Sequence, residues 1–349
     1  MKDLTHRLAL LTGLRDREAL EDAMVDLVFR CLGSQVVGVK LFRVVVDGGR
    51  NCCMPVLERK AADTQPVRMD PNPMPGELPL LDELPLLRRA FTLGTTQSQA
   101  SDVATGAACL YCLPLLDGLP VLLEVELAAE PEASDITWLE DLFRVYGNVV
   151  ALLDYGEKDT LTELLNRKTF DVAFIKAAAG LESAPNKTLD QERRHSADTR
   201  GAWLAVLDID HFKRVNDTYG HLIGDEVLLL VARLMRSCFR YSDQLYRFGG
   251  EEFVILMRCD GEADALRVLE RLRSVFENHR FPQVGNITVS LGVSQVFHND
   301  IPSEAFGRAD EAVYYAKSHG RNQVQSYQKL VAQGELIAQV KEGMVVDLF

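Results

Sequence analysis

Two adjacent carboxylates follow a pair of glycines in the middle of the chain, in the segment Arg-Phe-Gly-Gly-Glu-Glu-Phe at 247–253. The apolar run at 254–257 is typical of a strand, so the glycine pair predicts a two-residue hairpin turn with positive φ. Glu251 and Glu252 would repel each other beside such a turn. A divalent metal held by carboxylates and phosphates would relieve that repulsion, whereas in an ordinary hairpin both acids would only be solvated.

A second pair of carboxylates follows a predicted buried strand. The apolar run at 203–207 leads directly into Asp208-Ile209-Asp210. Acidic side chains at the C-terminal end of a central strand commonly hold a metal, because the crevice there opens to solvent while the strand stays rigid. A long amphipathic helix is predicted after Asp225, which would place this carboxylate at a helix N-terminus. Capping alone would also explain Asp225.

The overall composition is that of a globular protein with enough length for two domains. The chain has 349 residues, 47% of them hydrophobic and 26% charged, with a net charge of −13. This charge argues against a nucleic-acid partner and against binding at a membrane surface. The sequence has no apolar run long enough to span a bilayer and no signal-peptide layout at its N-terminus. We therefore expect a cytoplasmic protein without membrane insertion.

The seven cysteines do not form a disulfide framework, because their number is odd and they are scattered along the chain. Cys109 and Cys112 match C-x-x-C, but they lie in a predicted strand, where residues three apart face opposite sides. A metal or redox site at these thiols, even with Cys52 and Cys53 added, is therefore disfavoured. Buried small residues are the preferred interpretation.

Residues from about 5 to 130 read as one α/β unit. Strand-like runs are predicted at 36–46, 107–116 and 121–127, and six prolines between Pro66 and Pro85 indicate a long irregular loop. A helix precedes the strands, with apolar residues at helical spacing at Leu20, Met24, Leu27, Val28 and Cys31. This order resembles a GAF sensor domain, and the resemblance rests on layout alone, with no ligand motif.

A second helix is predicted from about Asp135 to Tyr155, with Ser134 as its N-cap. Its apolar residues step by three and four over two heptads: Leu139, Leu142, Tyr146, Val149 and Leu153. A helix packed on its own domain would show the same spacing. We favour a dimeric connecting helix, because the segment lies between domains, where such a seam could transmit a signal. Residues 183–201 are polar without periodicity and predict a loop insertion.

Several spaced motifs in the second half of the chain resemble the GGDEF family of diguanylate cyclases. They are the segments at 208–213, 216–217, 220–221, 224–225 and 249–253. The segment at 159–168 is similar to the family's opening D-x-L-T-G-L-x-N-R-R, with Glu163 in place of glycine and Lys168 in place of arginine. The segment at 315–322 matches A-K-x-x-G-R-N. The resemblance spans about Asp159 to Tyr327, roughly half of the chain.

The resemblance implies a ferredoxin-like palm, related to nucleotidyl cyclases and polymerases. It also implies a reaction that joins two GTP into cyclic di-GMP with release of pyrophosphate. The expected fold class is α/β (α+β), with a GAF-like antiparallel sheet and its helices preceding the palm. The expected order is a GAF-like regulatory domain at 1–133, a connecting helix at 134–158, a catalytic GGDEF domain at 159–328 and a tail at 329–349.

The resemblance further implies a metal site and an acid–base group. Asp208, the Ile209 carbonyl and Glu251 would hold Mg²⁺, with Mn²⁺ as an alternative. Glu252 would be a further ligand or an acid–base group. The metal would polarise the α-phosphorus and lower the pKa of the attacking 3′-hydroxyl.

Substrate contacts are implied for a second set of residues. Lys213, which also counts as catalytic, would hold the β- and γ-phosphates together with Lys317 and Arg321. The turn glycines, Gly249 and Gly250, would let the backbone approach the phosphates. The remaining substrate-site residues are Phe212, Asn216 and Asp225. Asn216 and Asp225 would read guanine, since an aspartate accepts from the ring N–H and amino group that adenine does not present.

An inhibitory product site is implied by Arg240-Tyr241-Ser242-Asp243, at the family's distance from the glycine pair. Arg240 and Asp243 would bind cyclic di-GMP, and Arg271 could contribute from a second face. A solvated helix end would explain R-x-x-D by itself, and a solvated arginine would explain Arg271.

The expected protein is a GTP-dependent homodimer, because the 3′-hydroxyl of one GTP must attack the α-phosphate of the other. Its N-terminal domain would respond to an unidentified small molecule or protein. Two alternatives stay open. One is a catalytically silent receptor of cyclic di-GMP, and the other is a signalling scaffold whose partner matters more than turnover.

Overall fold

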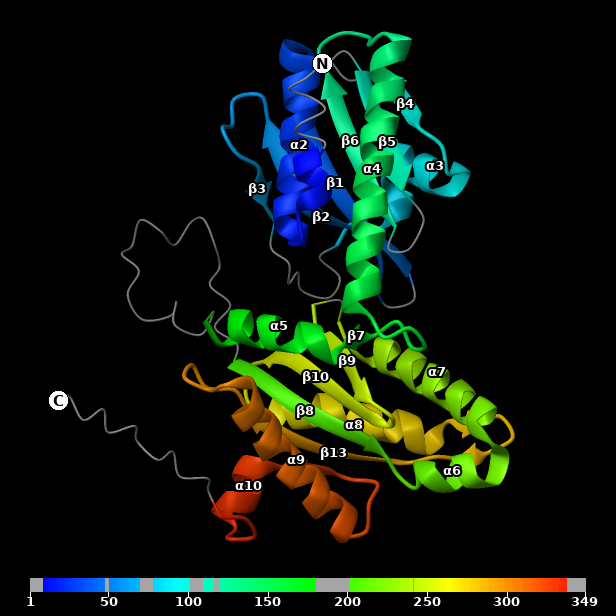
Figure 1. The fold of residues 1–349 in the computed structure, drawn as a ribbon, viewed down its shortest axis with the longest axis vertical. Coiled ribbons are helices and arrows are strands. Elements are labelled where there is room, and N and C mark those ends of the chain that lie inside the picture. The colour runs from blue at the N-terminus through cyan, green and yellow to red at the C-terminus, as the bar shows by residue number, and fades with distance from the viewer. Residues whose placement is uncertain are drawn as a thin grey trace, which may run out of the picture. The chain divides into compact units, whose positions relative to one another are not determined.

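The structure is a computed structural model that describes residues 9–47, 50–69, 78–100, 109–115, 120–179, 201–240 and 242–337. The chain divides into two compact units, which are described separately (Figure 1). The N-terminal unit comprises Met1–Gly156 with Arg240–Ser242, and the C-terminal unit comprises Glu157–Phe239 with Asp243–Phe349. The predicted insertion at 183–201 lies outside the described residues, apart from Gly201.

The N-terminal unit contains a six-stranded antiparallel sheet in the order β3-β2-β1-β6-β5-β4. The strands are β1 (Val36–Asp47), β2 (Arg50–Lys60), β3 (Val67–Arg68), β4 (Gln97–Ala100), β5 (Cys109–Leu115) and β6 (Val121–Leu127). The helices are α2 (Arg17–Leu32), α3 (Pro85–Leu93) and α4 (Ala133–Glu157), with short 3₁₀ turns at Gly33–Gln35 and Leu81–Glu83. The three predicted strands are confirmed.

Strand β2 and helix α3 lie between the predicted strands at 36–46 and 107–116, and the sequence analysis predicted neither of them. Pro55 lies within β2 at a register shift against β1, where a bulge lets a proline enter a sheet. Pro85 is the first residue of α3, a position where a helix needs no backbone N–H. Both prolines therefore belong to regular elements.

The two faces of this sheet carry separate hydrophobic clusters. One face packs against α2 and α4 and includes Cys52 and Cys109, while the other packs against α3 and includes Cys53 and Cys112. The predicted divergence of the paired thiols is thus confirmed. Burial raises the pKa of Cys53 to about 12 and also raises that of Cys112. Both thiols are therefore protonated at neutral pH, which makes them poor nucleophiles and metal ligands. Cys31, expected on the buried face of α2, is exposed.

Helix α4 uses its heptad seam inside its own unit. All five seam residues, from Leu139 to Leu153, are buried in the cluster shared with α2 and the sheet. The prediction that this seam pairs two copies is therefore wrong. The helix begins at Ala133, so Ser134 lies in its first turn instead of capping it, and the Asp135 carboxylate accepts from the Glu132 N–H.

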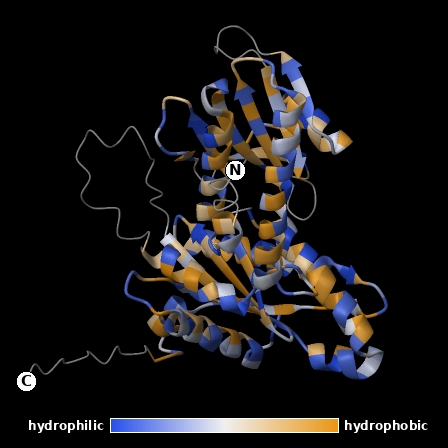
Figure 2. Ribbon diagram, turned by 45° about the horizontal axis from the view of Figure 1, so that its top comes forward, coloured by the Kyte–Doolittle hydropathy of each residue, from blue (hydrophilic) through white to orange (hydrophobic). Residues whose placement is uncertain are grey.

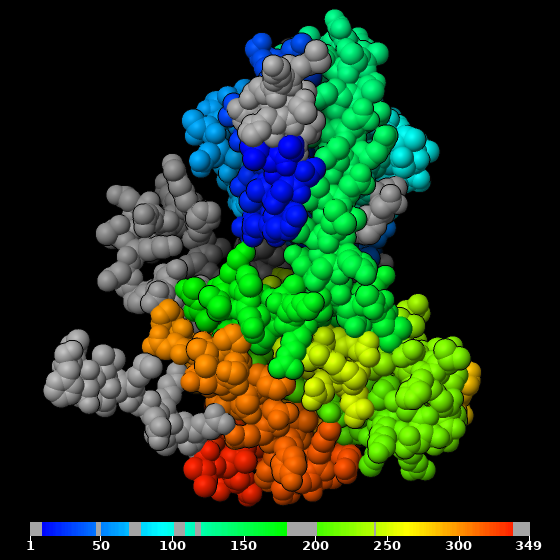
Figure 3. Space-filling view, viewed as in Figure 1, coloured from blue at the N-terminus to red at the C-terminus, as the bar shows by residue number. Residues whose placement is uncertain are grey.

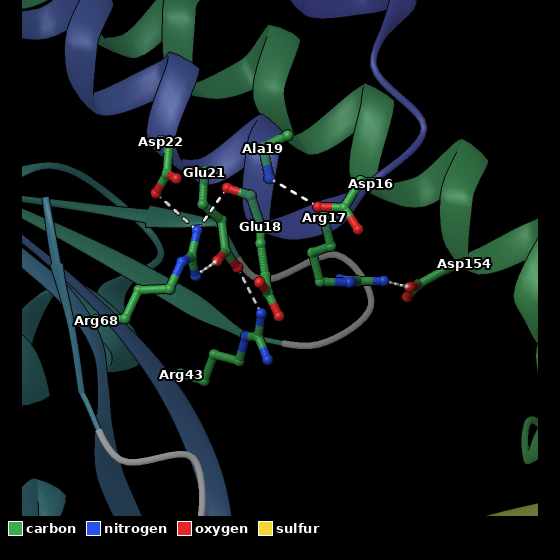
Figure 4. Close-up of polar contacts among 9 residues, drawn as sticks. All are labelled: Asp16, Arg17, Glu18, Ala19, Glu21, Asp22, Arg43, Arg68 and Asp154. Atoms are coloured by element: carbon green, nitrogen blue, oxygen red, sulfur yellow. Dashed lines mark hydrogen bonds and ion pairs between the residues drawn. The ribbon is translucent and has the colours of Figure 1, made fainter. Parts of the chain in front are cut away.

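Helices α2 and α4 lie side by side (Figures 1 and 3). Ion pairs reinforce their packing and join α2 to the sheet (Figure 4). Glu21 of α2, fully buried, pairs with Arg43 of β1 and with Arg68 of β3. Arg17 of α2 pairs with Asp154 in the last turn of α4. The C-terminal end of α4 is thereby held to its own unit by charge as well as by apolar packing.

The C-terminal unit contains a second six-stranded sheet, in the order β14-β13-β8-β10-β9-β7. The strands are β7 (Leu165–Asn166), β8 (Gly201–Ile209), β9 (Gln244–Gly249), β10 (Glu252–Cys259), β13 (Val289–Gln295) and β14 (Val324–Ser326); β11 (Arg280–Phe281) and β12 (Gly285–Asn286) form a small separate hairpin. The helices are α5 (Arg167–Ala179), α6 (Phe212–Tyr219), α7 (His221–Cys238), α8 (Glu262–Asn278), α9 (Pro302–Ser318) and α10 (Tyr327–Ala332).

The four long strands follow a β-α-β-β-α-β path and lie in the order β13-β8-β10-β9. This is the arrangement of a ferredoxin-like sheet, so the predicted fold class is confirmed. The two central strands, β8 and β10, consist largely of hydrophobic residues, as expected when both faces of the sheet are covered (Figure 2). One face packs against α6, α7 and α8, and the other packs against α5 and α9. No helix among the described residues is both long and apolar enough to cross a membrane.

Candidate functional site

Asp208 stands near the end of the central strand β8 and is 8% exposed. Its register partners are Glu252 on β10 and Ser290 on β13. Lys317 in the last turn of α9 places its Nζ 2.6 Å from the Asp208 Oδ1. Burial raises the pKa of Asp208, and the Lys317 ammonium opposes that rise. A buried carboxylate and one cation therefore meet at the end of the strand.

The approach of α9 to the sheet explains how Lys317 reaches this strand. Gly292 on β13 lies directly under the helix, because a Cβ at that position would be 2.1 Å from the Ala309 carbonyl oxygen. Any larger residue would push the helix away from the sheet. The missing side chain at Gly292 thus lets the last turn of α9 lie near the end of β8.

The acidic hairpin differs by one residue from the predicted turn. Gly249 ends β9 and pairs with Glu252, so the two turn residues are Gly250 and Glu251. Only Gly250 of the glycine pair has positive φ, at 44°. The predicted role of both glycines in the turn is therefore wrong for Gly249. Burial raises the pKa of Glu251, and the charge of Asp208 raises it further, which indicates that the two carboxylates act on each other.

Arg247 ties this hairpin to the opening motif of the unit. Its Nε and Nη2 donate to the Gly250 carbonyl oxygen at 3.2 and 3.0 Å, and its Nη1 donates to Asp159 at 3.0 Å. Burial alone would raise the pKa of Asp159, but hydrogen bonds from Thr162 and Arg247 outweigh it and lower that pKa. The turn and the segment that follows α4 therefore share one guanidinium.

The carboxylates at the strand end suit a hard divalent cation. The Asp208 Oδ1 is buried, and its partner among the described residues is the Lys317 ammonium, so this carboxylate is available to a metal if the ammonium moves to a bound anion. The Glu251 carboxylate and the Ile209 carbonyl would complete an all-oxygen donor set, the kind that Mg²⁺ and Mn²⁺ prefer. No group of three or more His, Cys, Asp or Glu side chains is gathered for a metal within the described part of the chain. The remaining ligands would come from substrate and water.

Gly224, the residue before Asp225, lies against the side chain of Asn216. Gly224 of α7 is buried against α6, and a Cβ there would lie 2.0 Å from the Asn216 Oδ1 and 3.5 Å from the Phe212 ring. The side chain of Asn216 therefore rests on the backbone next to Asp225. Helix α7 begins at His221, so Asp225 is its fifth residue, and the prediction that it stands at a helix N-terminus is wrong. Its side chain is exposed.

Two further predicted phosphate ligands lie on separate elements. Lys213 is exposed in the first turn of α6. Arg321 lies in the loop after α9 and has positive φ, at 60°, with its N–H donating to the Ala316 carbonyl oxygen at 2.9 Å.

The R-x-x-D residues lie in the connection between α7 and β9. Arg240 follows the end of α7 closely, Asp243 directly precedes β9, and Tyr241 falls outside the described residues. Arg271 of α8 donates to the Cys238 carbonyl oxygen at the end of α7, so its guanidinium lies at the start of this connection. The predicted role of these three residues stays a prediction.

The sequence analysis missed two residues that shape the site. Gly224 was noted only as part of a motif, and its spacing from Asn216 gives no sign of the close contact. Arg247 precedes the glycine pair, and a cation next to a sharp acidic turn is the signal that could have revealed its role. Both act through backbone atoms, which side-chain patterns do not record.

Residues 157–323 match the family model described as "Diguanylate cyclase, GGDEF domain". Diguanylate cyclase DgcZ of Escherichia coli K12 is 38% identical over 183 residues, which are 49% of this chain and 56% of DgcZ. The response regulator PleD of Caulobacter vibrioides NA1000 is 46% identical over 125 residues, which are 34% of this chain and 28% of PleD. The crystal structure of the GGDEF domain of DgcB from Caulobacter crescentus in complex with c-di-GMP is 32% identical, with a TM-score of 0.42, over 50% of this chain and 94% of that one. The chain thus spans about half the length of DgcZ and less of PleD.

We predict that Gly224→Ala displaces Asn216. The added methyl group overlaps the Asn216 Oδ1, so the variant should lose about 1–3 kcal/mol of unfolding free energy, as overpacked sites do. Chemical denaturation measures this loss. The double variant Gly224→Ala with Asn216→Ala should recover most of it, because the overlapping atom is gone. Equal losses in the single and double variants would show that the contact does not exist.

Proposed function

Residues 157–323 are a GGDEF domain, and from this premise we propose that the chain is a diguanylate cyclase that condenses two GTP into cyclic di-GMP and two pyrophosphates. The convergence of Asp208, Glu251 and Lys317 at the end of β8 carries this proposal. The two carboxylates could bind the metal of a metal–triphosphate complex, and the cation could bind its phosphate oxygens. The activities named for DgcZ and DgcM, which match this chain over about half its length, support the same reaction.

Asp208, the Ile209 carbonyl and Glu251 would hold Mg²⁺, or Mn²⁺ in its place. When bound, the metal supplies charge neutralisation at the triphosphate and lowers the pKa of the attacking 3′-hydroxyl. Lys317 neutralises part of the Asp208 charge, and its ammonium would hold phosphate oxygens of the substrate beside the metal-binding carboxylates. Glu252 is exposed beside the turn and would serve as a further ligand or acid–base group.

The contact between Asn216 and Gly224 supports guanine recognition at this corner of the unit. Asp225 exposes its carboxylate beside that contact, where it can accept from the ring N–H and the amino group of guanine. Phe212 is buried, and its ring lies near Gly224, the glycine that the Asn216 side chain also contacts. Lys213 and Arg321 would hold the β- and γ-phosphates, and Gly249 and Gly250 would let the hairpin backbone come close to them.

Turnover would need a homodimer, since each domain brings one GTP and the two must meet face to face. The seam first expected to pair the copies is buried within the N-terminal unit. Another stripe of α4 remains for pairing: Asn148, Leu152 and Tyr155 follow heptad spacing, and the last two side chains are 71% and 79% exposed. We assign the dimer contact to this stripe.

Regulation would come from the N-terminal unit and from the product. The antiparallel sheet with helices on both faces fits the GAF-like layout, but the matched residues, 157–323, lie outside this unit. Its GAF assignment and its signal therefore stay predictions, as does the cytoplasmic location. Arg240 and Asp243 would bind cyclic di-GMP as an inhibitor, and Arg271 lies near enough to the end of α7 to assist.

Glu251→Ala should reduce cyclic di-GMP synthesis by at least about 100-fold, because a metal ligand beside Asp208 is lost. Purified protein is incubated with GTP and Mg²⁺, and the products are separated by chromatography. Wild-type specific activity should also rise with protein concentration if a dimer is needed. Asp260→Ala, an exposed acid just beyond the other end of β10, is the control and should keep its activity. Continued synthesis by Glu251→Ala refutes the metal assignment, and a wild-type protein that binds product but makes none is the silent receptor.

Asp225→Ser should relax base selectivity, because a hydroxyl cannot accept from two adjacent donors on guanine as a carboxylate does. We expect the ratio of kcat/KM for GTP over ATP to fall about 10- to 100-fold. Steady-state kinetics with each nucleotide measures it. Glu226→Ser, the neighbouring exposed acid, should leave the ratio unchanged. An unaltered ratio in Asp225→Ser would remove this residue from the guanine site.

Arg240→Ala should weaken inhibition by cyclic di-GMP by about tenfold or more, since a charge-assisted contact with the product is lost. The inhibition constant is measured from initial rates at increasing product concentrations. Arg267→Ala, which removes an exposed arginine of α8, is the matched control. Equal inhibition constants in the wild type and in Arg240→Ala would exclude this residue from the inhibitory site.

A further inference from the structure

Asp210 lies two residues beyond Asp208, but the structure commits its carboxylate to a different task. The residue is 5% exposed. Its Oδ1 accepts from the Ser290 hydroxyl at 2.7 Å, and its Oδ2 accepts from the Thr288 hydroxyl at 2.7 Å and from the Asn322 N–H at 3.0 Å. Both oxygens are thus occupied by donors of the protein. This carboxylate is therefore an anchor for the segment that contains Asn322.

That segment has an unfavourable backbone conformation. Gly320, Arg321 and Asn322 all have positive φ, at 109°, 60° and 45°. Residues with a side chain rarely adopt such values, and two of them in succession persist only where the surroundings fix the backbone. The Asn322 N–H, immediately after Arg321, is the group that Asp210 holds. The hydrogen bond therefore acts on the strained part of the loop.

Helix α8 holds the same loop from its other side. Arg273 Nη1 donates to the Asn322 Oδ1 at 2.9 Å, and the Asn322 Nδ2 donates to the Glu277 Oε1 at 2.8 Å. Arg273 and Glu277 also pair with each other at 2.9 Å. The backbone of Asn322 is thus bound by Asp210 and its side chain by α8. Both contacts therefore fix the backbone next to Arg321 and so set the direction in which its side chain leaves the loop.

We propose that Asp210 is a positioning residue that fixes the loop at 320–322 so that Arg321 presents its guanidinium to a pyrophosphate group. The proposal rests on the assignment of Arg321 to the triphosphate under the proposed function. It gives Asp210 no part in binding the metal, in contrast to Asp208, whose Oδ1 faces the Lys317 ammonium and no hydroxyl or backbone N–H. Two nearby carboxylates of one motif thus have separate tasks.

An asparagine at position 210 can replace this carboxylate, because the neighbouring groups are adaptable. The amide oxygen can accept from the Asn322 N–H and the Thr288 hydroxyl, while the amide nitrogen donates to the Ser290 hydroxyl oxygen, since hydroxyl groups both donate and accept. An alanine cannot hold any of the three groups. A metal ligand would behave differently, because loss of the charge would itself impair binding.

The test compares Asp210→Ala, Asp210→Asn and Ser290→Ala. Ser290→Ala is the matched control, since it removes one hydrogen bond from the same buried carboxylate and leaves the Asn322 contact intact. Binding of inorganic pyrophosphate with Mg²⁺ is measured by calorimetry on the full chain, and KM and kcat for GTP are measured separately. Thermal melting followed by circular dichroism shows that each variant is folded.

For Asp210→Ala we expect a rise of about tenfold in both the pyrophosphate Kd and the KM for GTP, with kcat changed less than about threefold. Asp210→Asn and Ser290→Ala should stay within about threefold of the wild type in all three quantities. Should Asp210→Ala fail to fold, Asp210→Ser takes its place, because its single hydroxyl cannot hold all three groups; the pyrophosphate Kd and the KM for GTP should then both rise by more than about threefold.

Three results would overturn the proposal. They are unchanged pyrophosphate affinity in Asp210→Ala, a loss of kcat well beyond about threefold in Asp210→Asn, and a wild-type protein that does not bind pyrophosphate. A wild-type protein that makes no cyclic di-GMP but binds pyrophosphate in an Asp210-dependent manner refutes the proposed function and supports the positioning role. The calorimetric measurement therefore separates the two.

Discussion

The close approach of like charges at the end of β8 is the constraint on which the C-terminal unit depends. Asp208 is buried, Glu252 is its cross-strand partner, and the charge of Asp208 acts on Glu251 in the adjoining turn. Such a group is unfavourable without a nearby cation, because low-dielectric surroundings strengthen the repulsion. Lys317 supplies that cation from another helix. The fold must therefore deliver the end of α9 to this strand, and Gly292 makes this approach sterically allowed.

The same corner is stabilised through backbone atoms as much as through side chains. Arg247 holds the Gly250 carbonyl and Asp159 together, so the acidic turn is linked to the first residues after α4. Asp210 and α8 hold the strained loop that carries Arg321. Each of these contacts reaches a segment without regular structure, where repeating backbone hydrogen bonds are missing. At these points, hydrogen bonds from charged side chains fix the backbone in place of repeating backbone hydrogen bonds.

The sequence predicted the fold of the C-terminal unit better than its local geometry. The order of motifs correctly indicated the ferredoxin-like sheet and brought Asp208 to the strand end. The predicted turn was off by one residue, because the sequence pattern shows that a turn exists but not which two residues pair across it. Helix α7 was predicted to start after Asp225 but begins at His221, because Gly224, a poor helix former, made the segment from His221 to Asp225 unlike a helix. Contacts such as Gly224 with Asn216 depend on two helices meeting, which no linear spacing encodes.

Helix α4 shows why a heptad pattern does not reveal which surface covers its apolar stripe. An apolar stripe repeating every three and four residues fits another helix or a sheet of the same unit equally well, because burial does not depend on which chain supplies the covering surface. Here α2 and the sheet cover the stripe, and Arg17 holds the last turn through Asp154. A second copy would have to use the face that includes Leu152 and Tyr155.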